Sequence, residues 1–263
     1  MEKCLPIIDI LTLAATGSEM DCGGVISNPE TKDKIGLLFP VMQPKVSFLD
    51  PTTTYSVSAY QTAAGSADIF NHIIEVYFNM NQDLYMLDTV MEGLMKTVIK
   101  YAPIAIKEPE NYEARSNLMW TSSWAINGFI KGGKQQAWSC HPMEHELSAI
   151  YDITHGHGLA ILTPRWLEYT LDERTVSKFY QYGINVWGID STLSKMEVAK
   201  KSIQMTSDFL FNKLGLKSTL TDLGIDDTNF KIMAKKAEKL GGTMYGFKPL
   251  AAKDIEEIFR MCL

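Results

Sequence analysis

Four of the chain's five histidines lie within one stretch of twenty residues, "SCHPMEHELSAIYDITHGHG", at positions 139–158. The fifth, His72, stands four residues after Asp68 in "SADIFNHIIE". On a helix, positions i and i+4 lie on one face about one turn apart, so both side chains of such a pair point the same way. His141 and His145 repeat this spacing. A fold that buries these segments must supply partners for the rings, because burying unpaired polar groups is costly.

Taken singly, these residues have ordinary interpretations. An Asp-x-x-x-His pair is most often an exposed polar pair, His145 could be a satisfied core imidazole, and a histidine before glycine often ends a helix. Taken together, they favour a metal site, because a helix, a turn and a return would bring His155 back to His141, fourteen residues earlier. Pro142 is tolerated if it falls in the first turn of its helix. Imidazoles with one carboxylate suit zinc or ferrous iron, whereas calcium and magnesium prefer oxygen ligands.

Composition excludes several classes of protein. The 263 residues carry a net charge of −6 and form no basic stripe, so nucleic-acid binding is not expected. The N-terminal segment lacks the basic start of a signal peptide, and no apolar run is long enough to cross a bilayer, so no membrane partner is expected. We expect a cytoplasmic protein in a reducing compartment, because the four cysteines form no CxxC pair and no disulfide framework: Cys4, Cys22, Cys140 and Cys262.

Two sequence patterns divide the chain. Residues 1–55 hold short β-branched and apolar runs broken by Gly, Pro, Asn and Asp, which predict a few strands joined by turns. Residues 56–263 carry apolar side chains at helical spacing, as in "DLYMLDTVMEGLMKTVIKYAPIAI". Ser194 with Glu197 predicts a capped helix start, and Gly215 predicts the end of the same segment. The chain is therefore expected to be mainly α, with a short β segment in front.

Several ordered motifs carry a family resemblance. "LTLAATGSEMD", "FLDPTTTYSV", "ADIFNHIIE", "HPMEHELSAIYDITHG" and "LAILTPRWLEY" resemble consecutive blocks of the iron-containing alcohol dehydrogenase family, most closely its butanol dehydrogenase branch. The resemblance continues through "GGTMYGFKPL" and so covers essentially the whole chain. It implies the helical metal-binding domain of the dehydroquinate synthase-like fold at residues 56–263. Residues 1–55 would then be the C-terminal remnant of the family's α/β nucleotide-binding domain.

The resemblance also implies roles for particular residues. Family members hold a metal with one aspartate and three histidines, and a further histidine near the metal and the substrate is thought to assist proton transfer. That further histidine is His145 here, and His157 falls where the family varies, so it is interpreted as a neighbour of the site. The metal positions fall on Asp68, His72, His141 and His155.

The activity implied is that of an NAD(P)-linked alcohol dehydrogenase or aldehyde reductase acting on short aliphatic substrates such as butanol and butyraldehyde. Fe²⁺ is the expected metal and Zn²⁺ the alternative, with NAD or NADP as the hydride carrier. Apolar side chains near the site, Phe70, Trp138 and Tyr151, would suit such a substrate, although core packing explains them equally well. A homodimer is compatible with the resemblance, but the sequence does not fix the oligomeric state.

The cofactor contacts are expected in the segment "TLAATGSE", which approaches the nicotinamide in relatives: Thr12, Leu13 and Thr16, with Lys34 as a weaker candidate. Without the resemblance, "AATGSE" is typical of a tight turn that uses its glycine. The family's Gly-Gly-Gly-Ser stretch, which meets the pyrophosphate, is not found in this sequence. We therefore expect a truncated dehydrogenase that binds dinucleotide poorly, with unpaired strand edges and an exposed apolar face in residues 1–55.

Two alternatives stay open. A metallohydrolase could use the same histidines and aspartate to activate water, although "TLAATGSE" would then lack a purpose. An inactive metal-binding fragment is the other. NAD(P)H oxidation with butyraldehyde separates the dehydrogenase from both, and metal content separates the inactive fragment from the two enzymes.

Overall fold

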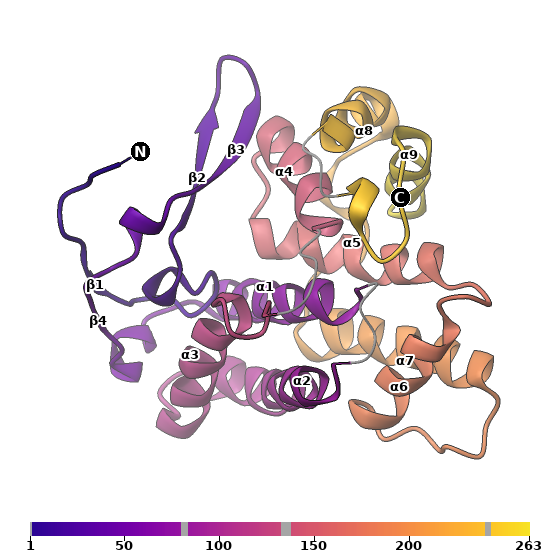
Figure 1. Ribbon diagram of the computed structural model, residues 1–263, viewed down its shortest axis with the longest axis horizontal. Coiled ribbons are helices and arrows are strands. Elements are labelled where there is room, and N and C mark those ends of the chain that lie inside the picture. Colours follow the sequence, from indigo (N-terminus) through magenta and orange to yellow (C-terminus); the bar gives the residue numbers. More distant parts are fainter. Residues whose placement is uncertain (1, 80–83, 133–137, 240–242) are drawn as a thin grey trace.

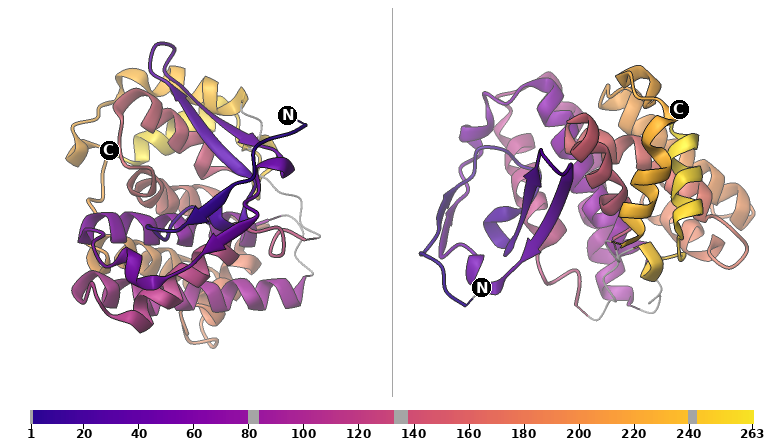
Figure 2. Two further views of the ribbon diagram at one scale, coloured as in Figure 1. Left: turned by 90° about the vertical axis from the view of Figure 1, so that its left-hand side faces the viewer. Right: turned by 90° about the horizontal axis from the view of Figure 1, so that it is seen from above.

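The computed structural model describes residues 2–79, 84–132, 138–239 and 243–263 (Figure 1). A body of helices carries a small group of strands on one side, as two further views also show (Figure 2). The prediction of a mainly helical chain with a short β segment is confirmed. The division into a nucleotide-binding remnant at residues 1–55 and a catalytic domain at residues 56–263 stays a prediction.

The strands form two separate pairs. β1 (Ile8–Ile10) pairs in parallel with β4 (Val46–Phe48), and β2 (Gly23–Asn28) forms an antiparallel hairpin with β3 (Asp33–Leu38), in which Val25 stands opposite Gly36. Apolar side chains of the parallel pair face outward: Ile8, Ile10 and Phe48 are 68%, 62% and 55% exposed. The expected exposed apolar face in this segment is therefore present. A two-stranded pair of this kind has little stability of its own.

The helical body is built around α1 (Ala59–Tyr77), which is buried along nearly its whole length. α1 packs against α2, α3 and α5, and α4 packs against α5 and α8. Small residues in "TAAGSA" let neighbouring backbones come close to α1, while its second half supplies large core side chains such as Phe70 and Tyr77. The remaining helices are α2 (Tyr85–Lys107), α3 (Tyr112–Ile126), α4 (Cys140–Tyr151), α5 (His155–Thr170), α6 (Val176–Asn185), α7 (Lys195–Asp208), α8 (Phe230–Lys239) and α9 (Ala252–Met261).

Local capping explains several helix ends. The side chain of Ser194 accepts the backbone N–H of Glu197, and the Glu197 carboxylate accepts the Ser194 N–H, as the capping-box spacing predicts. Gly215, with φ of +74°, ends the same segment after a short π-helical extension. Within the described ranges, no helix combines the length and apolar character needed to cross a membrane.

Candidate metal centre

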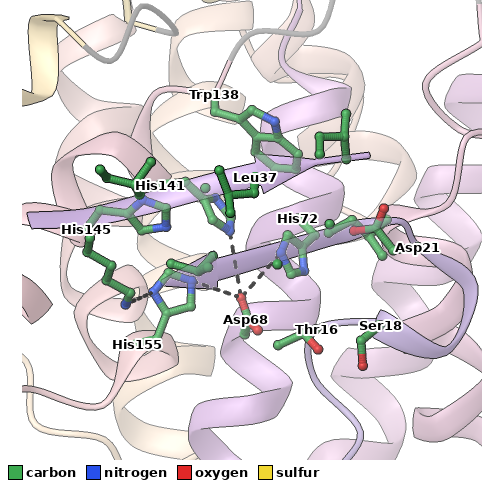
Figure 3. A pocket seen from close by; sticks show the side chains of 18 of the residues that line it. Thr16, Ser18, Asp21, Leu37, Asp68, His72, Trp138, His141, His145 and His155 are labelled. Carbon is green, nitrogen blue, oxygen red and sulfur yellow. Dashed lines mark hydrogen bonds and ion pairs between the residues drawn. The ribbon is translucent and has the colours of Figure 1, made fainter. Parts of the chain in front are cut away.

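Three imidazoles converge on one carboxylate oxygen. Oδ1 of Asp68 lies 3.6 Å from Nε2 of His72, 3.9 Å from Nε2 of His141 and 3.8 Å from Nε2 of His155 (Figure 3). Asp68 and His72 stand one turn apart on α1, whereas His141 comes from the first turn of α4 and His155 begins α5. The structure thus brings together all four residues that were predicted as metal ligands.

These atoms are spaced as ligands rather than as hydrogen-bond partners. In a tetrahedral shell with metal–ligand distances of about 2.0–2.2 Å, neighbouring ligand atoms lie about 3.4 Å apart. Oδ1 of Asp68 and Nε2 of His141 are buried, and neither has a hydrogen-bond partner among the residues that the structure describes. Burial lowers the pKa of His72 to about 3 and the pKa of His141 well below its usual value, so both rings are neutral. The donor set therefore fits a divalent metal ion.

Glycines bring α5 close enough for this convergence. A β-carbon on Gly156 would overlap the backbone of Ala64 in α1, and one on Gly158 would come within 2.9 Å of the Glu144 side chain in α4. Because His155 is the first residue of α5, its interpretation as a helix C-terminal residue is wrong. The two glycines of "HGHG" allow α5 to pack closely against α1 and α4.

Glu75 organises the start of α4. Its carboxylate accepts the backbone N–H of Ser139 at 2.7 Å and that of His141 at 3.0 Å, and its Oε1 lies 3.0 Å from Nδ1 of His141. Burial raises the pKa of Glu75 to about 8, against the opposing effect of these N–H groups. Pro142 is the third residue of α4 and so falls in the first turn, as its tolerance requires. The sequence analysis missed Glu75, although its spacing of seven residues from Asp68 places both on one face of α1.

His145 lies beside the four residues, and its ring, the His155 ring and the Glu144 carboxylate offer ligand atoms within 4.8 Å of one another. Its ring centre is 5.6 Å from that of His155 and 6.3 Å from that of His141, and it lines the same pocket. Burial lowers the pKa of His145 to about 4. This position fits the role expected from the resemblance, which stays a prediction.

Glu144 was also missed. It is fully buried and contacts Nδ1 of His155, and Nζ of Lys34 lies 3.4 Å from its Oε2. Burial alone would raise the pKa of Glu144, but His155 and Lys34 outweigh it and lower the pKa to about 2. For His155, burial opposes protonation, yet the Glu144 carboxylate raises its pKa overall.

The four converging residues open into a pocket of about 630 Å³. The β2–β3 hairpin and Trp138 line it, and Trp138 lies across the pocket from Asp68 (Figure 3). Phe70 and Tyr151, in contrast, belong to the packing of the helical core, so they do not shape the pocket wall.

The predicted cofactor contacts separate into two groups. Thr16 and Lys34 line the 630 Å³ pocket. Thr12 is exposed and Leu13 lines a separate small pocket with Arg115, so neither faces the four converging residues. The structure therefore places only Thr16 and Lys34 where a molecule in the pocket would touch them.

The loop "ATGSE" is fixed by two of its residues. Gly17 has φ of +65°, a left-handed conformation that glycine adopts without strain, so the expected tight turn is present. Glu19 is buried and accepts hydrogen bonds from the hydroxyls of Ser122 and Ser123 in α3. These contacts hold the loop that places Thr16 in the lining of the pocket.

His157 uses both ring nitrogens elsewhere. Nδ1 lies 3.1 Å from the Tyr60 hydroxyl, and Nε2 lies 3.0 Å from the Lys217 carbonyl oxygen, to which it donates as the protonated nitrogen of the ring. It is therefore a structural neighbour of His155, as the sequence interpretation held.

Comparison with known proteins decides the family. A model of the Fe-containing alcohol dehydrogenase family, C-terminal, matches residues 62–263, and a model of iron-containing alcohol dehydrogenase matches residues 1–51. The chain belongs to the iron-containing alcohol dehydrogenase family. This family is one of oxidoreductases, and its name and those of its members associate it with a metal and a nicotinamide cofactor.

Individual members of the family are similar over nearly the whole chain. NADH-dependent butanol dehydrogenase B of Clostridium acetobutylicum is 53% identical over 99% of this chain and 67% of its own length. NADPH-dependent aldehyde reductase YqhD of Escherichia coli is 38% identical over 94% of this chain and 63% of its own. The solved NADH-dependent butanol dehydrogenase A of Thermotoga maritima superposes with a TM-score of 0.92 at 34% identity, covering 99% of this chain and 67% of that one.

This chain thus spans about two thirds of the length of these relatives. Their names agree with the prediction of an NAD(P)-linked alcohol dehydrogenase or aldehyde reductase, and none of those quoted supports the metallohydrolase alternative.

Proposed function

We propose that Asp68, His72, His141 and His155 bind one divalent metal, and that the protein uses it in the NAD(P)-linked interconversion of short aliphatic alcohols and aldehydes such as butanol and butyraldehyde. The observation that carries the proposal is the convergence of three Nε2 atoms on Oδ1 of Asp68, which accepts no hydrogen bond from the described residues, at the wall of a pocket. Fe²⁺ is the metal that the family name favours, and Zn²⁺ suits the same donors.

A divalent metal at this position supplies a Lewis acid for an alcohol or carbonyl oxygen, and the nicotinamide supplies or accepts the hydride. The chain contributes the shape and the apolar lining of the pocket. Val25, Ile35, Leu37 and Leu38 of the hairpin line it together with Trp138, and an apolar wall of this kind favours an alkyl chain over a charged substrate.

The polar residues of the pocket have distinct proposed roles. His145 is proposed as an acid–base residue that passes a proton to or from the substrate oxygen, and its place in the lining of the pocket supports this role. Thr16 and Lys34 are proposed to contact the cofactor, whereas Thr12 and Leu13 have less support because they lie outside the pocket. A cytoplasmic location and a homodimer stay predictions.

The test combines metal content with activity. We expect the purified protein to hold one divalent metal per chain and to oxidise NADH or NADPH with butyraldehyde only slowly and at high cofactor concentration, because dinucleotide binding is expected to be poor. Asp68→Asn should remove the metal, whereas Asp208→Asn, in α7 and hydrogen-bonded to Gln204 and Asn212, should retain it. Metal retained by Asp68→Asn would contradict the ligand assignment, and metal without aldehyde reduction would contradict the proposed activity.

A further inference from the structure

Glu144 is a buried carboxylate with donors around both oxygens. It lies on α4, three residues after His141 and one before His145. Its Oε2 contacts Nδ1 of His155, and Oε1 accepts the hydroxyl of Ser148. Nζ of Lys34, on β3 of the hairpin, lies 3.4 Å from Oε2 and supplies a compensating positive charge. Such a pairing is what a carboxylate needs in order to be buried.

The contact with Glu144 determines which nitrogen of His155 faces Asp68. Two groups lie at Nδ1 of His155: Oε2 of Glu144, which only accepts hydrogen bonds, and Nζ of Lys34 at 3.4 Å, which only donates them. The carboxylate makes the closer contact, so Nδ1 carries the proton. Nε2 then keeps its lone pair, and this is the atom that lies 3.8 Å from Oδ1 of Asp68. The His141 ring has a comparable orientation, since its Nδ1 lies 3.0 Å from Oε1 of Glu75 and its Nε2 faces Asp68.

His155 has particular need of such an anchor. Its side chain is 26% exposed, against 12% for His141 and 5% for His72, so protein packing restrains its ring least. It also begins α5, with no turn of the same helix before it. The chain leaves room for the anchor, since a β-carbon on Gly158 would come within 3.0 Å of Oε1 of Glu144.

We propose that Glu144 is a positioning residue, which holds the His155 ring in the orientation that directs Nε2 into the metal site. This inference rests on the proposed metal site but assigns a role to a residue outside the four ligands. Outer carboxylates that fix a ligating histidine typically contribute about 10–100-fold to metal affinity.

Binding of Co²⁺ tests this role without any assay of catalysis. Co²⁺ affinity is measured by competition with a chelator, and the d–d absorption spectrum reports the ligand geometry. We expect Glu144→Ala to bind Co²⁺ about 10–100-fold more weakly, with an altered spectrum. Glu144→Gln, whose amide oxygen still accepts the Nδ1–H, should recover affinity to a value between those of Glu144→Ala and the wild type.

Glu146 provides the matched control. It lies on the same helix and is equally buried, but its carboxylate pairs with Lys236 at 3.3 Å. Glu146→Ala should therefore leave Co²⁺ affinity and the spectrum as in the wild type. Wild-type affinity and spectrum in Glu144→Ala would overturn the positioning role while leaving the metal site intact. No stoichiometric Co²⁺ binding by the wild type would overturn the proposed metal site itself.

A second measurement needs no variant and so does not depend on whether Glu144→Ala folds. Long-range ¹H–¹⁵N NMR of the Zn²⁺-loaded wild-type protein reports which nitrogen of His155 is protonated. We expect the proton on Nδ1 and the metal on Nε2. Coordination of the metal through Nδ1 would overturn the inference.

Discussion

Gly156 and Ala64 lie so close that a β-carbon on Gly156 would overlap the carbonyl oxygen of Ala64. Gly156 directly follows His155, and Ala64 stands one helical turn before Asp68. Because α5 crosses α1 at this glycine, the contact fixes the position along α1 at which the His155 side chain meets Asp68. A packing contact thus sets the geometry of the candidate metal centre.

Gly156→Ala should consequently destabilise the fold and weaken metal binding together. Overpacking of this kind typically costs about 1–3 kcal/mol of the free energy of unfolding. Urea unfolding of the metal-free protein measures the loss, and Co²⁺ titration measures the change in affinity.

Gly93→Ala is the matched control: Gly93 is exposed on α2, and a β-carbon there meets nothing within 4 Å. The Gly93→Ala substitution should raise the free energy of unfolding by about 0.5–1 kcal/mol. Equal effects of the two substitutions would contradict the argument.

The spacing of residues predicted part of this site. Positions i and i+4 correctly placed Asp68 with His72 on one helix face, and the gap from His141 to His155 correctly suggested a helix, a turn and a return. Spacing alone could not separate His141 from His145, because both share a face of α4. The resemblance made that choice, and the convergence on Oδ1 of Asp68 agrees with it.

The residues that were missed act across helices. Glu75 holds the start of α4 from α1, and Glu144 meets His155 from the neighbouring helix. Local patterns do not report such contacts, because they depend on how helices pack. The same limit applies to the strands: the short apolar runs indicated β structure, but the parallel pairing of β1 with β4 joins segments nearly forty residues apart. Such pairing is set by tertiary contacts.

Glu75→Ala should destabilise the protein by more than its lost packing. The substitution leaves the N–H groups of Ser139 and His141 without their acceptor in a buried place, at about 1–3 kcal/mol of the free energy of unfolding. Thermal unfolding followed by circular dichroism checks this. The exposed Glu110, changed to Ala in parallel, should shift stability by no more than about 0.5 kcal/mol. A wild-type melting curve for Glu75→Ala would show that water replaces the carboxylate at no cost.

His145→Ala should leave one metal per chain and reduce turnover by about 10²–10⁴-fold, the usual contribution of a general acid or base. The reason is its place in the pocket beside the cluster, one turn after His141 on α4. Metal content by mass spectrometry and aldehyde reduction are measured on the same preparation. His157→Ala also removes an imidazole, but one bonded to Tyr60 and Lys217, so turnover per folded chain should persist. Loss of metal in His145→Ala would make His145 a ligand.

The buried pair of Lys178 and Asp88 joins α6 to α2. Nζ of Lys178 lies 2.5 Å from Oδ2 of Asp88 and 3.7 Å from the centre of the Tyr77 ring, and both charged side chains are buried. Lys178→Met alone should cost about 3–5 kcal/mol, because it leaves a buried carboxylate without its cation. Combining it with Asp88→Leu should recover much of that loss in urea unfolding. If the double variant is no more stable than Lys178→Met, the loss of stability does not come from the buried charge of Asp88, and the prediction is wrong.

Asp172 should contribute to the loss of stability in acid. Its carboxylate accepts the backbone N–H groups of Arg174 and Thr175, and Nζ of Lys248 lies 3.4 Å away. Burial alone would raise the pKa of Asp172, but Arg174 and Lys248 outweigh it and hold the pKa well below its usual value. A group whose pKa is depressed on folding stabilises the protein above its unfolded pKa of about 3.9, and this stabilisation is lost as the pH falls towards the folded value.

Asp172→Asn keeps an acceptor but has no charge to lose. Its free energy of unfolding in urea should therefore fall less than that of the wild type between about pH 6 and about pH 3. Parallel losses in the two proteins would show that Asp172 is not among the groups that link protonation to unfolding.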